Sequence, residues 1–463
     1  MRSAPLLRWR LFQAAFVCTL LIAPQLEARD RGVRRSVRRL KIDTVPAGFR
    51  VGFCLLTHGH KQYVAYYDAQ HQMTVASRSV NASTWDYTKL PTKIGWDSHN
   101  YITMAMDDDG HLHLSGNMHV VPLIYFRTTK PGDASTLTRI DRMTGLEEKR
   151  CTYPKFMRGP SNELIFHYRS GSSGRGNEIY NVYDLKSKTW TRLLDQPLTN
   201  GRGKMNAYLS GPQLGPDGRY HMIWVWRDTS DCSTNHHLSY ARSPNLRDWE
   251  TAGGHNVPLP LTIDEKRLYV DPIPPKGGIL NGGAKLGFTS TNAPVVSYYK
   301  YDKNGKHQMY VAAFSGGKWR SKQLTDWDYR WDFSGGGSLP GVEVSVGAPH
   351  RIGAGKMRVS YRHKKYGSGH KEFKEADLRP DPVKNISIRT RAEPKSKGPG
   401  VPGDLRKVTS KFPGMGTMIS GDIGAPSVPN TTYVIRWESL SANRDRKPPK
   451  IPPDSTLELI EIR

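Results

Sequence analysis

The chain has 463 residues and a formal net charge of +26 at neutral pH. This length is enough to bury a sizeable core without disulfide or metal staples. After the N-terminal region, no run approaches the roughly 18 apolar residues of a membrane span. The charge would concentrate anionic partners around the protein. Alternatively, much of the charge lies in loops such as 362–411 and only keeps the protein soluble.

The N-terminus has the order of a secretory signal peptide. Three arginines accompany the apolar run Leu11–Ala23, and small and polar residues follow around Ala28. We therefore expect residues 1–28 to be a signal peptide and residues 29–45 to be a basic N-terminal segment of a secreted or periplasmic protein. A retained N-terminal anchor is the alternative. For an exported protein we expect an acidic polysaccharide as the partner and not a nucleic acid. We also expect no insertion into a membrane.

Cysteines are sparse. Cys18 would leave with the signal peptide, so the mature chain would keep Cys54, Cys151 and Cys232. Such an odd, small set is not a disulfide framework. One pair could form, and the sequence does not say which.

A turn followed by a short alternating strand recurs seven times along the chain. The copies are His58–Tyr67, Asp109–Ser115, Ser161–Arg169, Pro216–Trp226, Asn292–Lys300, Gly353–Tyr361 and Pro429–Trp437. Period-2 patterning bounded by turn residues is typical of strands. The spacing of roughly 50 to 75 residues suits a four-stranded propeller blade. We therefore expect an all-β fold, a seven-bladed β-propeller of four-stranded blades that occupies residues 46–463 as one domain.

Several units lead into a second strand that ends at a tryptophan. These stretches are Ala76–Trp85, Tyr183–Trp190, Ala241–Trp249 and Ala313–Trp319. We expect a hairpin turn in each and the indole in the gap between blades. The stretch 364–416, between units six and seven, is rich in Lys, Gly and Pro. A long basic loop without structure of its own is expected there, either at the rim of a substrate groove or simply solvated.

Two histidines flank the second unit. His99 and Asn100 lie in the segment Gly95–Tyr101 before it, and His119 follows it. The hairpin could bring both imidazoles to the same end of adjacent strands. Purely structural histidines are the alternative.

Polar aromatic residues and arginines follow in the next units. The hairpin of unit three can bring Tyr153 and Arg169 close together, although Tyr153 could instead pack on Pro154 and Arg169 could be a surface charge. Tyr208 stands just before unit four. Farther on, Arg330 and Trp331 precede a glycine run that lacks the spacing of a nucleotide-binding loop.

Histidine, tyrosine and arginine without a carboxylate pair suit β-elimination on a uronic acid. A cation must neutralise the C6 carboxylate, and a guanidinium does this well. A base must take the C5 proton and an acid must protonate the leaving O4, which tyrosine or histidine can do. A glycoside hydrolase would need two carboxyl groups around the scissile bond, and none stands out. A sialidase-like hydrolase and a non-catalytic propeller that binds acidic glycans are the alternatives.

Several short motifs, in this order, resemble the BNR-repeat propeller family that includes ulvan lyases. They are Gly95–Tyr101, Ser115–His119, Thr152–Phe156, Tyr329–Phe333 and Tyr433–Glu438. The likeness runs from about Pro46 to the end. It implies a lyase that cleaves at uronic acids next to sulfated rhamnose and leaves an unsaturated uronyl end.

The resemblance also implies roles for single residues. Tyr153 would be base and acid, and Arg169 would neutralise the carboxylate. His99 and His119 would assist or bind, and Tyr208 would line the groove. Whether a histidine or the tyrosine takes the proton stays open. Asn100, Arg330 and Trp331 are further expected substrate contacts.

A structural metal is a further implication of the resemblance. Cys232, His236 and His237, in the segment Asp231–His237, are suitable zinc ligands. Polar packing is the alternative, since no fourth ligand stands nearby. The expected protein is a monomer that needs no cofactor for catalysis, with structural zinc or calcium as an option.

Overall fold

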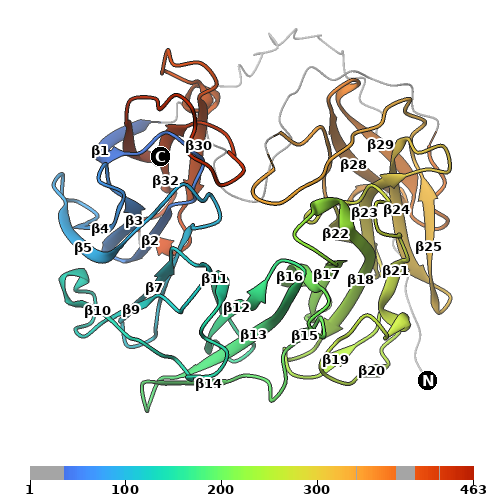
Figure 1. The fold of residues 1–463 in the computed structure, drawn as a ribbon, viewed down its shortest axis with the longest axis horizontal. Coiled ribbons are helices and arrows are strands. Elements are labelled where there is room, and N and C mark those ends of the chain that lie inside the picture. The colour runs from blue at the N-terminus through green and yellow to red at the C-terminus, as the bar shows by residue number, and fades with distance from the viewer. Residues whose placement is uncertain (1–35, 340, 382–401, 427) are drawn as a thin grey trace, which may run out of the picture. The chain divides into compact units, whose positions relative to one another are not determined.

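The structure, a computed structural model, describes residues 36–339, 341–381, 402–426 and 428–463. Its strands form seven separate sheets, here numbered 1 to 7 (Figure 1). The expected signal peptide 1–28 lies outside the described residues.

The first three sheets hold both ends of the described chain. Sheet 1 consists of β1 (Val37–Val45), β30 (Gly416–Gly421), β32 (Thr432–Ser439) and β33 (Ser455–Ile462). Sheet 2 consists of β2 (Cys54–Gly59), β3 (Lys61–Tyr67), β4 (Gln72–Ser79), β5 (Asp86–Lys93) and β31 (Ala425–Pro426). Sheet 3 consists of β6 (Ile102–Met106), β7 (Leu112–Gly116), β9 (Tyr125–Thr128) and β10 (Leu137–Arg139).

The two largest sheets follow. Sheet 4 consists of β8 (His119–Val121), β11 (Cys151–Arg158), β12 (Leu164–Ser172), β13 (Arg175–Asp184), β14 (Thr189–Arg192) and β15 (Thr199–Asn200). Sheet 5 consists of β16 (Asn206–Leu214), β17 (Tyr220–Arg227), β18 (Asn235–Ser243), β19 (Trp249–Glu250), β20 (Asn256–Val257) and β21 (Tyr269–Asp271).

The last two sheets have four strands each. Sheet 6 consists of β22 (Lys285–Phe288), β23 (Pro294–Tyr301), β24 (His307–Ser315) and β25 (Lys318–Gln323). Sheet 7 consists of β26 (Val344–Val346), β27 (His350–Gly353), β28 (Lys356–His363) and β29 (Gly367–Lys374).

Each of the seven sheets contains the strand of one predicted repeat unit. These strands are β3, β7, β12, β17, β23, β28 and β32. Sheets that follow one another along the chain touch through strands such as β2 and β6, β6 and β11, and β13 and β16. The all-β class is confirmed. A uniform set of four strands is not observed, because very short strands at some sheet edges raise the number to five or six.

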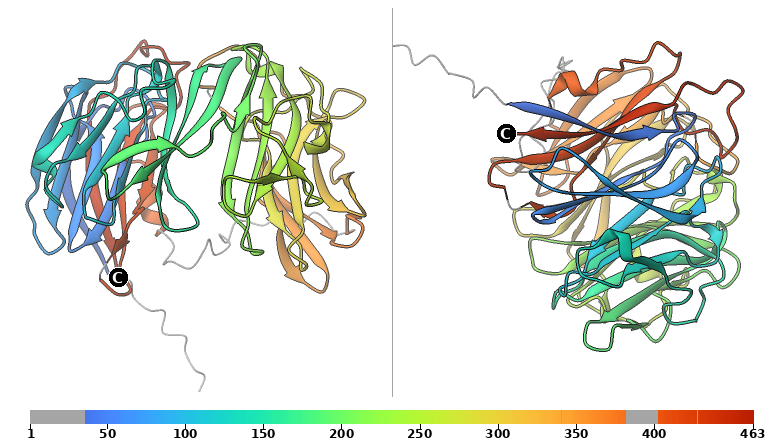
Figure 2. Two further views of the ribbon diagram at one scale, coloured as in Figure 1. Left: turned by 90° about the horizontal axis from the view of Figure 1, so that it is seen from below. Right: turned by 90° about the vertical axis from the view of Figure 1, so that its left-hand side faces the viewer.

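Sheet 1 joins the two ends of the described chain. β1 pairs antiparallel with the C-terminal strand β33 from Val37 opposite Ile462 to Val45 opposite Ser455. Figure 2 shows the blue strand beside the dark red ones. The β-sheet domain therefore begins at Val37 and not at the predicted residue 46. The last nine residues of the predicted basic segment form β1 and complete sheet 1.

The stretch 364–416 is not free of structure. β29 pairs with β28 along its whole length, and Phe373 on β29 is fully buried. Gly367 has a positive φ of 71° at the turn between these strands, which glycine adopts without strain. The expectation of a loop without structure is therefore wrong for β29, and residues 382–401 of the stretch lie outside the described part.

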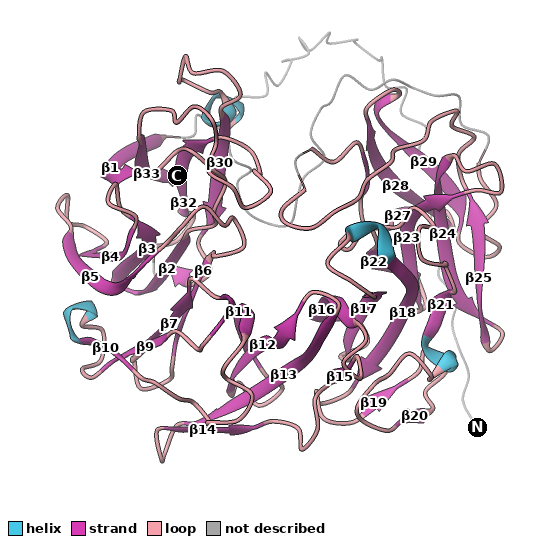
Figure 3. Ribbon diagram, viewed as in Figure 1, coloured by secondary structure: helices cyan, strands magenta, loops and turns pink. Residues whose placement is uncertain are grey.

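Helices contribute little to the described residues (Figure 3). They are four short 3-10 turns: η1 (Ala134–Thr136), η2 (Cys232–Thr234), η3 (Lys266–Leu268) and η4 (Gly403–Arg406). Within the described ranges, no helix is long and apolar enough to cross a membrane.

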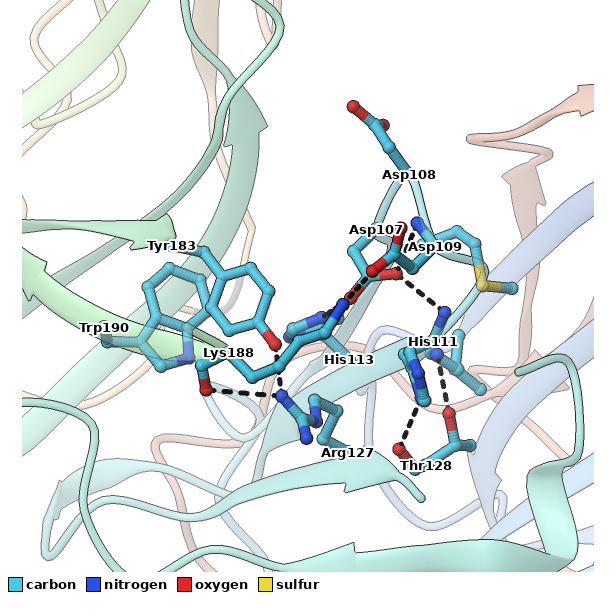
Figure 4. A network of polar contacts seen from close by, with 12 residues as sticks. Asp107, Asp108, Asp109, His111, His113, Arg127, Thr128, Tyr183, Lys188 and Trp190 are labelled. Atoms are coloured by element: carbon cyan, nitrogen blue, oxygen red, sulfur yellow. Dashed lines mark hydrogen bonds and ion pairs between the residues drawn. The ribbon is translucent and has the colours of Figure 1, made fainter. Parts of the chain in front are cut away.

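An aspartate shapes the hairpin turn in three of the sheets. One oxygen of Asp107 accepts hydrogen bonds from the backbone N–H of Asp109 and His111, while its other oxygen lies 3.2 Å from His113 Nε2 (Figure 4). Asp68 and Asp302 repeat this pattern at the same spacings. Such a side chain replaces the backbone partners that the tight turn leaves unpaired.

Tryptophans pack between neighbouring sheets. Trp190 of sheet 4 donates from Nε1 to Tyr125 Oη of sheet 3 at 3.2 Å. Trp319 of sheet 6 lies with its ring centroid 5.3 Å from that of Tyr240 in sheet 5. The indoles therefore occupy the expected positions between sheets. The three described cysteines are buried and unpaired, so no disulfide forms among them.

Candidate functional site

Three neighbouring strands of sheet 4 bring candidate residues into one row. His119 on β8 lies opposite Thr152 on β11, and Thr152 lies opposite Arg169 on β12. Thr152 also receives a hydrogen bond from Val120 N at its Oγ1, at 2.9 Å. The pairing therefore places His119 and Arg169 on either side of the strand that carries Tyr153.

Tyr153 stands in a β-bulge. The register of β11 against β12 shifts between Thr152 and Lys155, and Tyr153 itself has a positive φ of 59°. Val120 on the adjacent strand has a φ of 62°, a strained value for a β-branched residue. Bulges re-aim side chains and are frequent beside active sites, and local strain of this kind also gathers there.

Tyr153, Arg169, Tyr208 and Arg227 form what we call the tyrosine–arginine group. The guanidinium carbon of Arg169 lies 5.0 Å from the ring centroid of Tyr153 and 5.8 Å from that of Tyr208. The guanidinium carbon of Arg227 lies 5.1 Å from the ring centroid of Tyr208. Both arginines donate to Tyr208 Oη, at 3.1 Å from Arg227 and 3.5 Å from Arg169. Tyr208 is thus held between two cations.

The two tyrosines of this group have opposite electrostatic environments. Burial raises the pKa of Tyr153, and the neighbouring Tyr208 raises it further, against a smaller lowering by Arg169. Burial would also raise the pKa of Tyr208, but Arg227 and Arg169 outweigh it and lower the pKa below the ordinary value. Such divergence separates a group that keeps its proton from one that releases it.

Arg169 does not face solvent. Its side chain is completely buried behind the two tyrosine rings, and its Nε and Nη2 have no hydrogen-bond partner among the described residues. The expected contact of Arg169 with a substrate carboxylate stays a prediction. Its charge acts on Tyr153 and Tyr208 at short range through a poorly screening medium.

Asp97, His99, His119 and Asp445 form a second set, the histidine–aspartate group. His99 Nδ1 lies 2.8 Å from Asp97 Oδ1 and 3.3 Å from Asp445 Oδ1. His119 Nδ1 is hydrogen-bonded to the other oxygen of Asp97. The two imidazole rings lie 4.5 Å apart, and that of His99 lies 5.9 Å from the ring of Tyr153. The two groups are therefore adjacent.

Hydrogen bonds in the histidine–aspartate group stabilise the charged forms of His99 and Asp97. Burial alone would lower the pKa of His99, but Asp445 and Asp97 overcome it and raise the pKa to about 9. The hydrogen bonds from the two histidines lower the pKa of Asp97 although burial opposes them. His99 is therefore an imidazolium at neutral pH, with its positive charge balanced by carboxylates.

The histidine–aspartate group could also hold a metal ion. It offers four ligand atoms that all lie within 4.8 Å of one another, and zinc accepts such nitrogen and oxygen ligands. Within the described part of the chain it is the only such group. The expected ligands are not brought together in this way: His236 pairs with Asp228 and His237, while Cys232 is buried in an apolar cluster. These three residues therefore do not fit one structural metal.

Asn100 is buried beside the histidine–aspartate group. Its backbone oxygen accepts a hydrogen bond from Tyr67 Oη at 2.6 Å, whereas its side-chain Oδ1 has no partner among the described residues. Its backbone N–H donates to the backbone oxygen of Asp97. Asn100 therefore supports the turn that presents His99.

Arg330 and Trp331 do not join either group. The Arg330 guanidinium binds Asp332 and the backbone oxygen of Gly305, and it stacks on Tyr301 at 4.0 Å. Trp331 is buried in a core cluster with residues of sheets 6 and 7. The expectation that Trp331 contacts substrate is corrected by this burial, because a large ring packs better in the core than in water.

Sequence reasoning missed Arg227, Ser173, Asp97 and Asp445. Arg169 is the last residue of unit three and Arg227 directly follows unit four, so the repeat itself carried this signal. Ser173 Oγ lies 2.8 Å from Tyr208 Oη. Asp97 lies inside a segment already singled out. Asp445 comes from the loop before β33 and has no local signal.

Comparisons with known proteins show what this chain is similar to. A family model described as BNR repeat-containing family member matches residues 61–327. An ulvan lyase, long isoform, from Pseudoalteromonas sp. (strain PLSV) is 27% identical over 130 residues, 26% of this chain and 13% of that protein. The corresponding protein from Alteromonas sp. (strain LOR) is 28% identical over 142 residues, 27% of this chain and 14% of that protein. The matched part thus spans only a small share of these relatives.

Solved structures show the same fold over nearly the whole chain. The crystal structure of polysaccharide lyase Uly1 aligns with a TM-score of 0.56 at 13% identity, over 91% of this chain and 98% of that one. A PL25 ulvan lyase bound to -[GlcA(1-4)Rha3S]- aligns with a TM-score of 0.54 at 12% identity, over 91% and 95%.

Proposed function

The chain belongs to the BNR repeat-containing family, and from this premise we propose that it is a polysaccharide lyase that cleaves a uronate-containing, ulvan-like polysaccharide by β-elimination. The fold it shares with ulvan lyase structures supports a propeller scaffold, with its seven sheets as blades. The sequence match to ulvan lyases supports the substrate class. The net charge of +26 suits a polymer that carries carboxylates and sulfates.

One observation carries the chemistry: Tyr208 lies between two guanidinium groups, next to a second tyrosine whose environment favours the protonated form. An elimination needs a base and an acid that hold opposite protonation states at the same pH. The pKa values of the two tyrosines are shifted in opposite directions, which favours Tyr208 as the base and Tyr153 as the acid. His99 is not available as the base, since Asp97 and Asp445 hold it as an imidazolium.

In the proposed mechanism, the Tyr208 phenolate takes the proton from C5 of the uronate. The electron pair of the C5–H bond forms the C4–C5 double bond, and the C4–O4 bond breaks. The Tyr153 phenol then donates its proton to O4 of the leaving sugar. The expectation from sequence assigned both steps to Tyr153, and the lowered pKa of Tyr208 is the reason to divide them.

The arginines and histidines have supporting roles in this proposal. The positive field of Arg169 and Arg227 stabilises both the phenolate and the charge that develops on the uronate carboxylate. His99 and His119 lie on the other side of Tyr153 and bind sugar hydroxyl groups or the carboxylate edge. All proton transfers are assigned to side chains, so the reaction requires no cofactor.

The products of polymer digestion test the proposal. Ulvan and other uronate polymers are incubated with the purified protein without added metal or nucleotide, and ultraviolet absorbance and reducing ends are followed together. A lyase raises both. New reducing ends without the unsaturated chromophore would identify a hydrolase, and binding with neither signal would identify a glycan-binding propeller. Either result contradicts the proposal.

A further inference from the structure

A cationic hollow lies between sheets 3 and 4, outside both groups of the candidate site. It has a volume of about 760 Å³ and is lined by β9, β14 and the loop around residues 140–146. Arg127, Arg142, Lys188 and Arg192 line it, and none of its lining residues is acidic. Figure 4 shows Arg127 and Lys188 beside Trp190, which forms part of the wall.

Neutral partners hold two of these cations in place. Arg127 Nη1 donates to Tyr183 Oη and to the backbone oxygen of Lys188. Arg192 Nη1 donates to Asn181 Oδ1 at 2.8 Å. Neutral acceptors orient a guanidinium without cancelling its charge, so both arginines keep an uncompensated positive charge at fixed positions.

The other two cations are closer to solvent. Arg142 is exposed, and its guanidinium has no hydrogen-bond or ion-pair partner among the described residues. Lys188 pairs with Asp109, which is itself half exposed. A ligand anion can therefore gain these two charges without breaking a buried ion pair.

The remaining wall suits a sugar. Thr144 and Thr189 offer hydroxyl groups, while Ile140 and the exposed Leu146 offer apolar surface. Sugars present hydroxyl groups together with apolar C–H faces, and an acidic sugar adds a charge that arginine binds in a bidentate manner. Fixed cations, hydroxyl groups and apolar walls in one hollow fit an anionic saccharide.

A second hollow adjoins the cationic one. Arg142 lines both, and the second hollow, of about 400 Å³, also contains Asp141, Glu147 and Glu148 and extends to Ser170 and Gly171. Ser170 and Gly171 directly follow Arg169 on β12. The carboxylates of this second hollow repel an anionic polymer, so the cationic hollow is a separate contact and not the start of a continuous path.

We propose that the hollow formed by Arg127, Arg142, Lys188 and Arg192 binds sulfate or carboxylate groups of an acidic polysaccharide and holds the polymer at a distance from the point of cleavage. This inference rests on the proposed function for the identity of the polymer. Polymers that reach both places bind more tightly than short fragments, since the second contact is made within one complex.

Charge reversal in the hollow tests this binding directly. Affinity for ulvan is measured by affinity electrophoresis for the wild type, Arg142→Glu/Lys188→Glu and a matched control, Lys318→Glu/Lys322→Glu. The control makes the same charge change at exposed positions of β25. Reversal in the hollow should weaken binding about tenfold, and the control less than about twofold, because only the hollow places the new charges against the ligand.

Further measurements identify the anion that is bound and check that the variants are folded. Desulfated and carboxyl-reduced ulvan distinguish sulfate from carboxylate as the group that is bound. Thermal unfolding checks both double variants. Arg142→Glu alone repeats the test, because its exposed guanidinium has no partner whose loss would unfold the protein.

The outcomes separate this inference from the lyase proposal. Equal weakening in the hollow variant and its control would overturn the inference, even if ulvan is cleaved. A selective loss of affinity in the hollow variant supports the inference, even if no unsaturated ends are formed.

Discussion

The two halves of the candidate site contain similar numbers of charges and use them differently. In the histidine–aspartate group, Asp97 and Asp445 balance the imidazolium of His99. In the tyrosine–arginine group, Arg169 and Arg227 face Tyr208 without a carboxylate partner of their own. Balanced charge fixes geometry, whereas unbalanced charge shifts a pKa and stabilises developing negative charge. We therefore assign positioning and sugar binding to the histidine–aspartate group, and proton abstraction to the tyrosine–arginine group.

Removal of the Tyr208 hydroxyl should have the largest effect on activity. Tyr208→Phe is expected to lower kcat on ulvan by at least about 100-fold, because general base catalysis contributes that much or more. Initial rates of absorbance increase measure the loss. Tyr310→Phe is the matched control and should leave the rate unchanged, since the only hydrogen-bond partner of Tyr310 Oη among the described residues is Gln323 in sheet 6. A Tyr208→Phe enzyme with normal kcat would remove Tyr208 from the chemistry.

Loss of the Arg227 charge should have a smaller effect with a distinct signature. Arg227→Gln removes the largest influence that lowers the pKa of Tyr208. The base must be deprotonated, so activity rises with pH through its pKa, and a higher pKa moves this rise to higher pH. The expected loss of kcat/KM near neutral pH is about tenfold, and it should be partly recovered at alkaline pH.

Arg227→Lys provides the comparison for this variant. It keeps the positive charge but not all of the hydrogen bonds to Tyr208, Ser230 and Asp231. Its pH profile should stay close to that of the wild type. A loss of activity in Arg227→Gln that is the same at every pH would indicate a purely structural role.

The smallest effect concerns stability in the histidine–aspartate group. The folded-state pKa of His99, about 9, is above its ordinary value of 6.5. The interaction therefore stabilises the fold fully below pH 6.5 and is lost as pH rises through about 9. His99→Gln should cost about 1 kcal/mol of unfolding free energy at pH 6 and almost nothing at pH 10. Urea unfolding at both pH values measures this, and a cost that does not change with pH would contradict the assignment.

Much of the fold could be predicted because each strand has its own pattern of residues in a short stretch of sequence. The seven unit strands alternate apolar and polar residues between turn residues, and each lies in its own sheet. The strand β1 was missed because its partner β33 lies at the other end of the chain. Its charges Arg38, Arg39 and Lys41 also made it read as a basic tail. Pairing over such a separation leaves no local pattern.

The site was predictable only in part for the same reason. Tyr153 and Arg169 belong to one hairpin, so their proximity follows from the strand pairing. Asp445 reaches His99 from a distant loop, and no local pattern indicates it. The burial of Trp331 and of Arg169 depends on the packing of neighbouring sheets, which alternation along one strand does not specify.

A spectroscopic titration of the tyrosines tests the central claim, that two arginines make Tyr208 the more acidic tyrosine of the pair. The ultraviolet signal of tyrosinate is recorded against pH for the wild type, Tyr208→Phe and Tyr153→Phe. We expect one ionisation below the ordinary tyrosine pKa of 10.0 in the wild type and in Tyr153→Phe, and we expect it to be absent from Tyr208→Phe. An ionisation lost in Tyr208→Phe that instead lies at or above that value would show that the two arginines do not make Tyr208 more acidic.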